Sequence, residues 1–86
     1  MGTYRIEWRK SALRELKRLD RQVVPRIVTA VESLATDPLP VGVRKLQGGQ
    51  RTYRLRVGDY RVIYELLELR LLIEVVRVRH RREAYR

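Results

Sequence analysis

Two short segments of alternating apolar and polar residues, joined by Gly58 and Asp59, constrain the fold of this chain more than any other feature. Residues 52–57 (TYRLRV) and residues 60–66 (YRVIYEL) change side-chain character at every second position. A period of two is typical of strands with one buried face, and a Gly-Asp pair between them is typical of a tight hairpin turn. The sequence therefore predicts two adjacent antiparallel strands.

The predicted hairpin separates its side chains by charge. Tyrosine, leucine and valine fall on one face, and Arg54, Arg56 and Arg61 fall on the other. Because one face of a strand must pack against another layer, we expect the apolar face to lie on helices. The three arginines are then expected to project from the open side of the sheet.

The residues before the hairpin predict a strand and two helices. Residues 3–8 (TYRIEW) alternate as a half-buried strand does. Ser11 is a predicted N-cap of a short amphipathic helix, and Asp20 is a predicted cap of a second helix that ends before Asp37 and Pro38. Pro25 lacks an N–H group, so the second helix is expected to begin late or to bend there. The short link between the helices predicts an antiparallel helical hairpin.

The last predicted strand, residues 71–78 (LLIEVVRV), is apolar on both faces and suits the middle of a sheet. Alternation alone does not say which way Arg77, Arg79 and Arg81 point. In the hairpin before it, Leu67 and Leu69 indicate an exposed apolar patch for a protein partner, or simply a cap on the core.

These elements predict an α+β fold for residues 1–86 as one domain. An N-terminal strand and a two-helix antiparallel hairpin would pack on a mainly antiparallel sheet of about four strands. A chain of 86 residues buries too little surface for a deep enclosed pocket, so function is expected on an open face.

The charge of the chain predicts a polyanionic partner. Lys and Arg number 20 against 10 Asp and Glu, which gives a net charge of +10. Residues 44–86 hold 12 of the basic residues and 5 of the acidic ones. Nearly all of the positive charge is guanidinium, whose planar set of donors suits phosphate oxygens. Nucleic acid is therefore favoured over a membrane surface, and Arg44 and Lys45, in the loop-rich stretch of residues 39–50, are placed to reach a phosphate backbone.

Several function classes find no support in the sequence. The chain has no cysteine and one histidine, so neither a thiolate nor a histidine metal site is expected. No glycine-rich phosphate loop or nucleophile motif occurs, and no cofactor is expected. No signal peptide or membrane-length apolar run is seen, so a cytoplasmic location is expected.

Cleavage of RNA is a reaction that such a chain can support without a metal. The ribose 2′-hydroxyl attacks the adjacent phosphorus once it is aligned and the developing charge is neutralised. Arginines suit that second task, and His80 is the one side chain whose usual pKa suits proton transfer near neutrality. Tyr85 can orient the 2′-hydroxyl, stack on a base or hold the C-terminus.

The segments KLQGGQRTYRLRVGDYRVIYE and VVRVRHRREAYR, with a helical hairpin ending in LATDP, resemble the RelE/ParE superfamily of toxins, and its RelE-like branch in particular. The resemblance implies a type II toxin that enters the ribosomal A site and cleaves messenger RNA, leaving a 2′,3′-cyclic phosphate. It also implies a cognate antitoxin, and operator DNA bound only through the toxin–antitoxin complex.

Carried over by position, the resemblance assigns catalytic roles to Arg54, Arg56, Arg61, Arg81 and Tyr85, and we add His80 as a candidate. RNA-binding roles are expected for a second set: Arg44, Lys45, Arg77, Arg79 and Arg82. Arg79 stands where the family more usually has glycine. Leu67 and Leu69 are the candidates for antitoxin binding.

Two alternatives remain open at this stage. A ParE-like toxin shares the fold but inhibits DNA gyrase by binding, and Arg61, Arg81 and Tyr85 argue against it. A relative that binds RNA without cutting would keep the same basic face, and the chemistry of the product ends would distinguish it.

Overall fold

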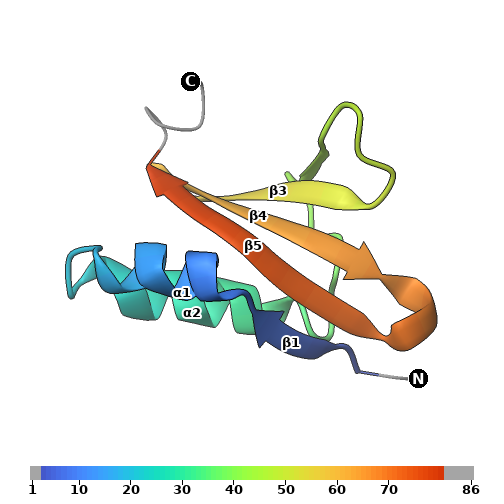
Figure 1. Cartoon of the computed structure of the whole chain (residues 1–86), viewed down its shortest axis with the longest axis horizontal. Helices are drawn as coiled ribbons and strands as arrows, with labels where there is room; N and C mark the ends of the chain where they lie inside the picture. Colours follow the sequence, from blue (N-terminus) through green and yellow to red (C-terminus); the bar gives the residue numbers. More distant parts are fainter. Residues whose placement is uncertain (1–2, 81–86) are drawn as a thin grey trace.

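The computed structural model describes residues 3–80, which form a five-stranded sheet with two helices against it (Figure 1). The elements in chain order are β1 (Arg5–Trp8), α1 (Lys10–Lys17), α2 (Val23–Ser33), β2 (Arg44–Lys45), β3 (Thr52–Val57), β4 (Tyr60–Leu67), the 3₁₀ turn η1 (Glu68–Arg70) and β5 (Leu72–His80). The strand order is β1-β5-β4-β3-β2, with β1 parallel to β5 and the other neighbours antiparallel. The predicted α+β fold is confirmed, and the fifth strand is the two-residue β2.

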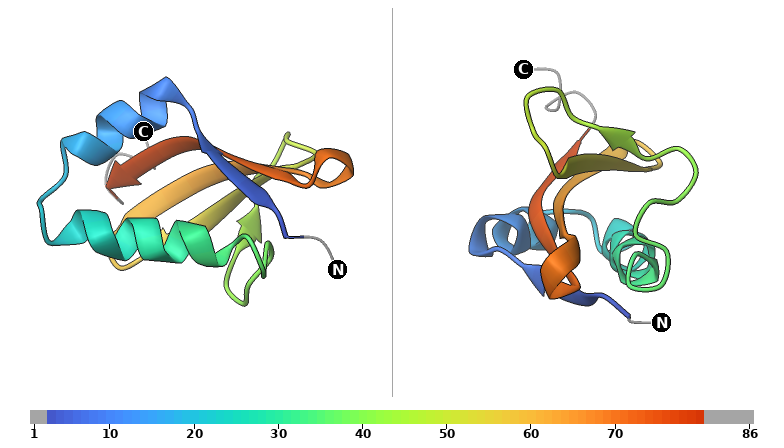
Figure 2. Two further views of the ribbon diagram at one scale, coloured as in Figure 1. Left: turned by 90° about the horizontal axis from the view of Figure 1, so that it is seen from below. Right: turned by 90° about the vertical axis from the view of Figure 1, so that its right-hand side faces the viewer.

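The two helices lie on the same side of the sheet, and the core forms between the two layers (Figure 2). We call the other side of the sheet its open face. In the core between the layers, buried apolar side chains of β4 and β5 meet those of both helices. The fully or almost fully buried set includes Ala12, Leu16, Ile27, Val31, Leu34, Val62, Tyr64, Leu66, Ile73, Val75 and Val78.

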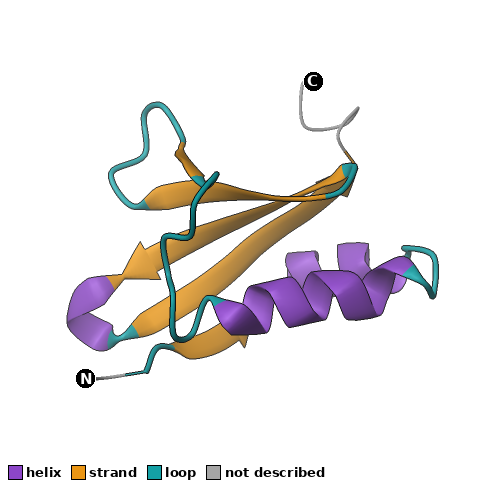
Figure 3. Ribbon diagram, turned by 180° about the vertical axis from the view of Figure 1, so that it is seen from behind, coloured by secondary structure: helices purple, strands orange, loops and turns teal. Residues whose placement is uncertain are grey.

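Tyr64 anchors the connection from α2 to the far edge of the sheet. Its side chain is 0% exposed, and its hydroxyl donates a hydrogen bond to the carbonyl oxygen of Pro38 at 2.6 Å. Tyr53, its cross-strand partner, stacks on it with 5.9 Å between ring centroids. The loop that passes from the end of α2 to β2 is therefore tied to the middle of the sheet (Figure 3).

The helix starts differ from the predicted ones. The prediction of Ser11 as an N-cap is wrong, because α1 begins at Lys10 after Arg9. Ser11 instead donates its hydroxyl hydrogen to the carbonyl oxygen of Val76 at 3.2 Å. The second helix begins late, at Val23, so Pro25 falls in its first turn, where no N–H group is needed.

A one-residue irregularity in β5 decides which side chains reach the open face. Tyr64 pairs with Val75, but Ile63 pairs with Arg77, so Val76 has no partner in β4. Such a bulge shifts the alternation of the strand by one residue. Val75 and Val78 both face the helices, while Arg77 and Arg79 lie on the open face.

Tyr64→Phe tests the anchor. Loss of the hydroxyl leaves the Pro38 carbonyl oxygen without this donor, so we expect the free energy of unfolding to fall by about 1 kcal/mol at neutral pH in urea titrations. Burial also raises the pKa of the Tyr64 hydroxyl. The Tyr64 hydroxyl therefore ionises at a lower pH in the unfolded chain than in the native protein. Above pH 10, the free energy of unfolding falls by up to about 1.4 kcal/mol per pH unit.

The phenylalanine variant has no such ionisation at position 64. The stability difference between the two proteins should therefore shrink as the pH rises above about 10. Parallel stability curves across that range would contradict the role given to Tyr64.

Candidate nucleic-acid interface

Three arginines form a row across the open face of the sheet. Arg61 of β4 is the cross-strand partner of Arg56 in β3 and of Arg79 in β5. Direct partners in an antiparallel sheet have Cβ atoms about 5 Å apart, and like charges in such pairs are destabilising. The chain thus concentrates positive charge on three neighbouring strands at a cost in stability.

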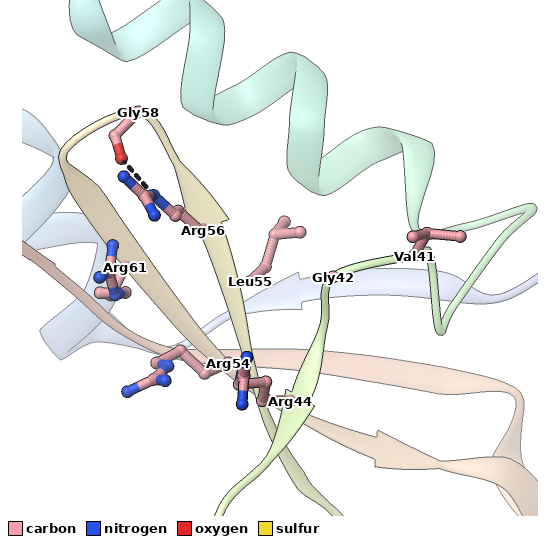
Figure 4. Close-up of a pocket in the computed structure, with 8 residues that line it drawn as sticks. All are labelled: Val41, Gly42, Arg44, Arg54, Leu55, Arg56, Gly58 and Arg61. Carbon is pink, nitrogen blue, oxygen red and sulfur yellow. Dashed lines mark hydrogen bonds between the residues drawn. The ribbon is translucent and has the colours of Figure 1, made fainter.

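A second row runs beside the first and extends it to the sheet edge. Arg54 pairs with Arg44 of β2 on one side and with Ile63 of β4 on the other, and Ile63 in turn pairs with Arg77. Arg44 and Arg54 lie next to one another in Figure 4. The two rows surround Ile63 with guanidinium groups, an arrangement that suits a chain of phosphates.

A depression of about 670 Å³ lies against the part of these rows that β2, β3 and β4 supply. Its lining includes four of the predicted arginines, namely Arg44, Arg54, Arg56 and Arg61, together with Val41, Gly42, Leu55 and Gly58 (Figure 4). Arg56 Nε donates a hydrogen bond to the carbonyl oxygen of Gly58 at 3.1 Å, which directs this side chain toward the hairpin turn. Gly58 has a φ of 59°, the left-handed region that a two-residue hairpin requires.

Arg61 departs from the prediction in one respect. It lies on the expected face, but it is only 6% exposed, so the prediction that it projects from that face is wrong. β4 lies between β3 and β5, and long arginine side chains flank position 61 on both sides. A guanidinium shielded from water interacts more strongly with an anion than an exposed one does.

Glu15 of α1 meets the arginines of β5. Its carboxylate oxygen Oε2 lies 3.0 Å from Arg79 Nε and 3.3 Å from Arg77 Nη1. Its other oxygen, Oε1, accepts the backbone N–H of Val78 at 2.8 Å. Sequence reasoning missed this residue, and the available signal was that Glu15 is the one acidic residue in an otherwise basic helix.

Two other predicted residues lie away from the arginine rows. Lys45 pairs with Tyr53, so it shares the helix-facing side of the sheet rather than the open face. His80 pairs with Tyr60 on that same side, and the two rings meet edge to face with 5.1 Å between centroids. Arg81, Arg82 and Tyr85 lie outside the described residues.

The far end of the open face has a different electrostatic character. Glu65 and Glu74 are cross-strand partners there. Arg9 Nη2 lies 3.0 Å from Glu74 and 3.9 Å from Glu65, and Arg51 Nε lies 3.7 Å from Glu65. The hydrogen bond with Glu74 raises the pKa of Arg9. The positive field is therefore concentrated near the β3–β4 turn.

The two candidate leucines for a protein partner lie at the β4–β5 connection. Leu69 in η1 is fully exposed, whereas Leu67 at the end of β4 is half-buried. Leu71, which follows η1 with a φ of 48°, adds further exposed apolar surface. This end of the sheet therefore offers a small apolar patch.

Two further observations concern residues 3–80 alone. No three His, Cys, Asp or Glu side chains in this part of the chain are placed to share a metal ion. Neither of the helices described there combines the length and the apolar content that a membrane span needs.

Comparisons with known proteins point to one family. Residues 6–85 match the family model described as the ParE toxin of a type II toxin–antitoxin system, parDE. Toxin RelG of Mycobacterium tuberculosis is 31% identical, over 96% of this chain and 97% of its own length.

Solved structures agree in fold. The RelE of the RelE–RelB complex from Pyrococcus horikoshii superposes with a TM-score of 0.82 at 31% identity, over 92% of this chain and 96% of that one. The isolated Escherichia coli RelE toxin superposes with a TM-score of 0.78 over 90% of this chain and 83% of that one, and at 20% identity it supports the fold alone.

Binding of a single-stranded RNA oligonucleotide tests the arginine rows. We expect Arg54→Ala and Arg56→Ala each to weaken binding at low salt and to reduce the slope of log K against log salt by about 0.7, the value for one lost phosphate contact. Fluorescence anisotropy over a salt series gives this slope.

Arg70→Ala is the matched control, because it removes the same charge from an exposed position in η1 at the other end of the sheet. Its slope should stay at the wild-type value. Equal slopes for all three variants would show that net charge, and not this face, determines binding.

Proposed function

The chain belongs to the RelE/ParE superfamily as a RelE-like toxin of a type II toxin–antitoxin system, and from this premise we propose that it is an endoribonuclease that cleaves messenger RNA in the ribosomal A site. The observation that carries the proposal is the pair of arginine rows on the open face of β2 to β5. They provide a surface for a phosphate backbone, and the desolvated Arg61 lies in their centre.

The chemistry needs no group beyond those of the chain and the RNA. The 2′-hydroxyl oxygen gives its proton to a base and attacks the adjacent phosphorus, the bond from phosphorus to the 5′-oxygen breaks, and that oxygen takes up a proton. The products are a 2′,3′-cyclic phosphate and a 5′-hydroxyl end. Arginines remain protonated near neutrality, so they stabilise the negative charge that develops on the phosphate oxygens. No metal ion is required for this step.

We propose roles from the positions of the described residues and, for Arg81, Arg82 and Tyr85, from the family resemblance alone. Arg61 and Arg81 stabilise charge at the scissile phosphate, while Arg54 and Arg56 position the strand. Tyr85 orients the 2′-hydroxyl or stacks on a base, and His80, whose ring lies on the helix-facing side, would transfer a proton only from around the end of β5. Arg44, Arg77, Arg79 and Arg82 extend the contact with the backbone, and Lys45 would contact a phosphate only from around the edge strand β2.

The partners follow from the same premise. A cognate antitoxin would cover the toxin, with Leu69 and Leu67 as anchors in the apolar patch beside η1. Several similar structures are complexes of RelE with RelB, which supports such a partner. Operator DNA would be bound only through the toxin–antitoxin complex, and the toxin would act as one domain in the cytoplasm.

Primer extension on messenger RNA held by ribosomes with an empty A site tests the activity. We expect discrete cuts in the A site with the intact protein, and about a hundredfold lower rate with Arg81→Ala, equivalent to about 3 kcal/mol of lost charge stabilisation. A 2′-deoxy substitution at the cut nucleotide should abolish cleavage, because it removes the nucleophile. Free messenger RNA is the control for ribosome dependence.

A second candidate function has one observation in its favour, namely that the matching family model carries the ParE name. A ParE-like toxin would inhibit DNA gyrase by binding. If the intact protein makes no cut on ribosomes, the nuclease proposal fails and gyrase supercoiling becomes the assay that decides.

A further inference from the structure

The free edge of β5 is covered by side chains of α1 instead of a strand. β1 pairs with β5 only as far as Trp8 and Val75, and Arg9 N–H then donates to the Val75 carbonyl oxygen at 2.9 Å. Beyond this point Ser11 bonds the Val76 carbonyl oxygen and Glu15 accepts the Val78 N–H. Two side chains four residues apart on one helix face thus replace the next ladder hydrogen bonds.

This arrangement fixes the carboxylate of Glu15. One oxygen is held by the Val78 N–H of the sheet, and the side chain is only 21% exposed. The second oxygen is thereby directed at Arg79 and Arg77, which reach the edge from the open face. A carboxylate held by backbone is a firm support for a second charged side chain.

Arg79 forms an ion pair with Glu15, while Arg77 Nη1 donates a hydrogen bond to the same carboxylate oxygen at 3.3 Å. The Nε atom of Arg79 is buried 3.0 Å from Glu15 Oε2 without hydrogen-bond geometry, whereas the residue as a whole is half-buried. A guanidinium has five N–H donors, so an ion pair at Nε leaves those of the two terminal nitrogens for an anion. Without a counter-charge, Arg79 would be repelled by Arg61, its direct partner in β4.

We propose that Glu15 is a positioning residue for RNA cleavage: it holds the guanidinium of Arg79 beside Arg61 and so completes the row of three arginines at the phosphate. The inference rests on the nuclease function proposed above. Glu15 itself does not touch the RNA. It acts by restricting Arg79 to one orientation, which matters more for the transition state than for binding the strand.

A double-mutant cycle on single-turnover cleavage by ribosomes tests this role. We expect Glu15→Gln to reduce the cleavage rate about tenfold or more in the native background, and by no more than about twofold in the Arg79→Ala background, because its effect passes through Arg79. Glutamine keeps an acceptor for the Val78 N–H, so the fold should survive. Glu32→Gln, at an exposed site on α2, removes the same charge and should leave the rate unchanged.

The same variant should not weaken RNA binding. Loss of Glu15 adds one net positive charge beside Arg77 and Arg79, so affinity should stay equal or rise while the rate falls. An equal loss from Glu15→Gln in both backgrounds, no loss at all, or a parallel fall in affinity and rate would overturn the proposal. So would a loss that disappears in an Arg77→Ala background instead.

A direct measurement separates this inference from the nuclease proposal. In ¹⁵N NMR spectra of the intact protein, the Nε–H signal of Arg79 should be protected from exchange, should broaden in Glu15→Gln, and should shift on addition of a 2′-O-methyl RNA oligonucleotide that cannot be cut. If the native protein cuts no RNA, the nuclease proposal fails, and these spectra still decide the role of Glu15. An Arg79 signal that ignores the Glu15 substitution or the oligonucleotide would overturn it.

Discussion

Burial of one face of β4 against the helices is the constraint on which the rest of this structure depends. Val62, Tyr64 and Leu66 alternate along the strand and are almost completely buried. Because side chains of a strand alternate strictly, this burial places Arg61 and Ile63 on the opposite face. A slip of one residue would expose the apolar set and bury the charged one, so the register with both neighbouring strands is strongly specified. The basic face is thus a geometric consequence of the core.

The same geometry explains why neighbouring guanidinium groups on the open face repel one another. A strand in the middle of the sheet cannot turn its side chain toward solvent as an edge strand can, so Arg61 is enclosed by its arginine partners. Repulsion along the row is offset at the β5 end by Glu15, a carboxylate supplied from the helix layer. At the β3 end, Arg56 is drawn to the carbonyl oxygen of the hairpin turn. Destabilised charge of this kind is typical of a surface selected for an anionic ligand.

Local patterns in the sequence predict the strands well and their surroundings less well. Residues 52–57 were predicted as a strand and form β3 with the same bounds, since alternation and a Gly-Asp turn act over a few residues. The burial of Arg61 was not predicted, because it depends on which strands lie on either side. The local sequence predicts Ser11 as a helix cap, but its hydrogen-bond partner is 65 residues away in β5. Glu15 was missed for the same reason, as its contacts span more than 60 residues.

The bulge at Val76 has a consequence for how this protein tolerates change in length. Upstream of it, Ile73 and Val75 face the helices at odd-numbered positions; downstream, the odd-numbered Arg77 and Arg79 face away from them. Because Val76 is accommodated as an extra residue, two guanidinium groups stay out of the apolar core. If Val76 were deleted, Arg77 would follow Val75 directly in a regular strand and would still face away from the helices. A regular strand that lost one residue would exchange its two faces from that point on, whereas β5 can lose this residue and keep the inside of the protein separate from its surface.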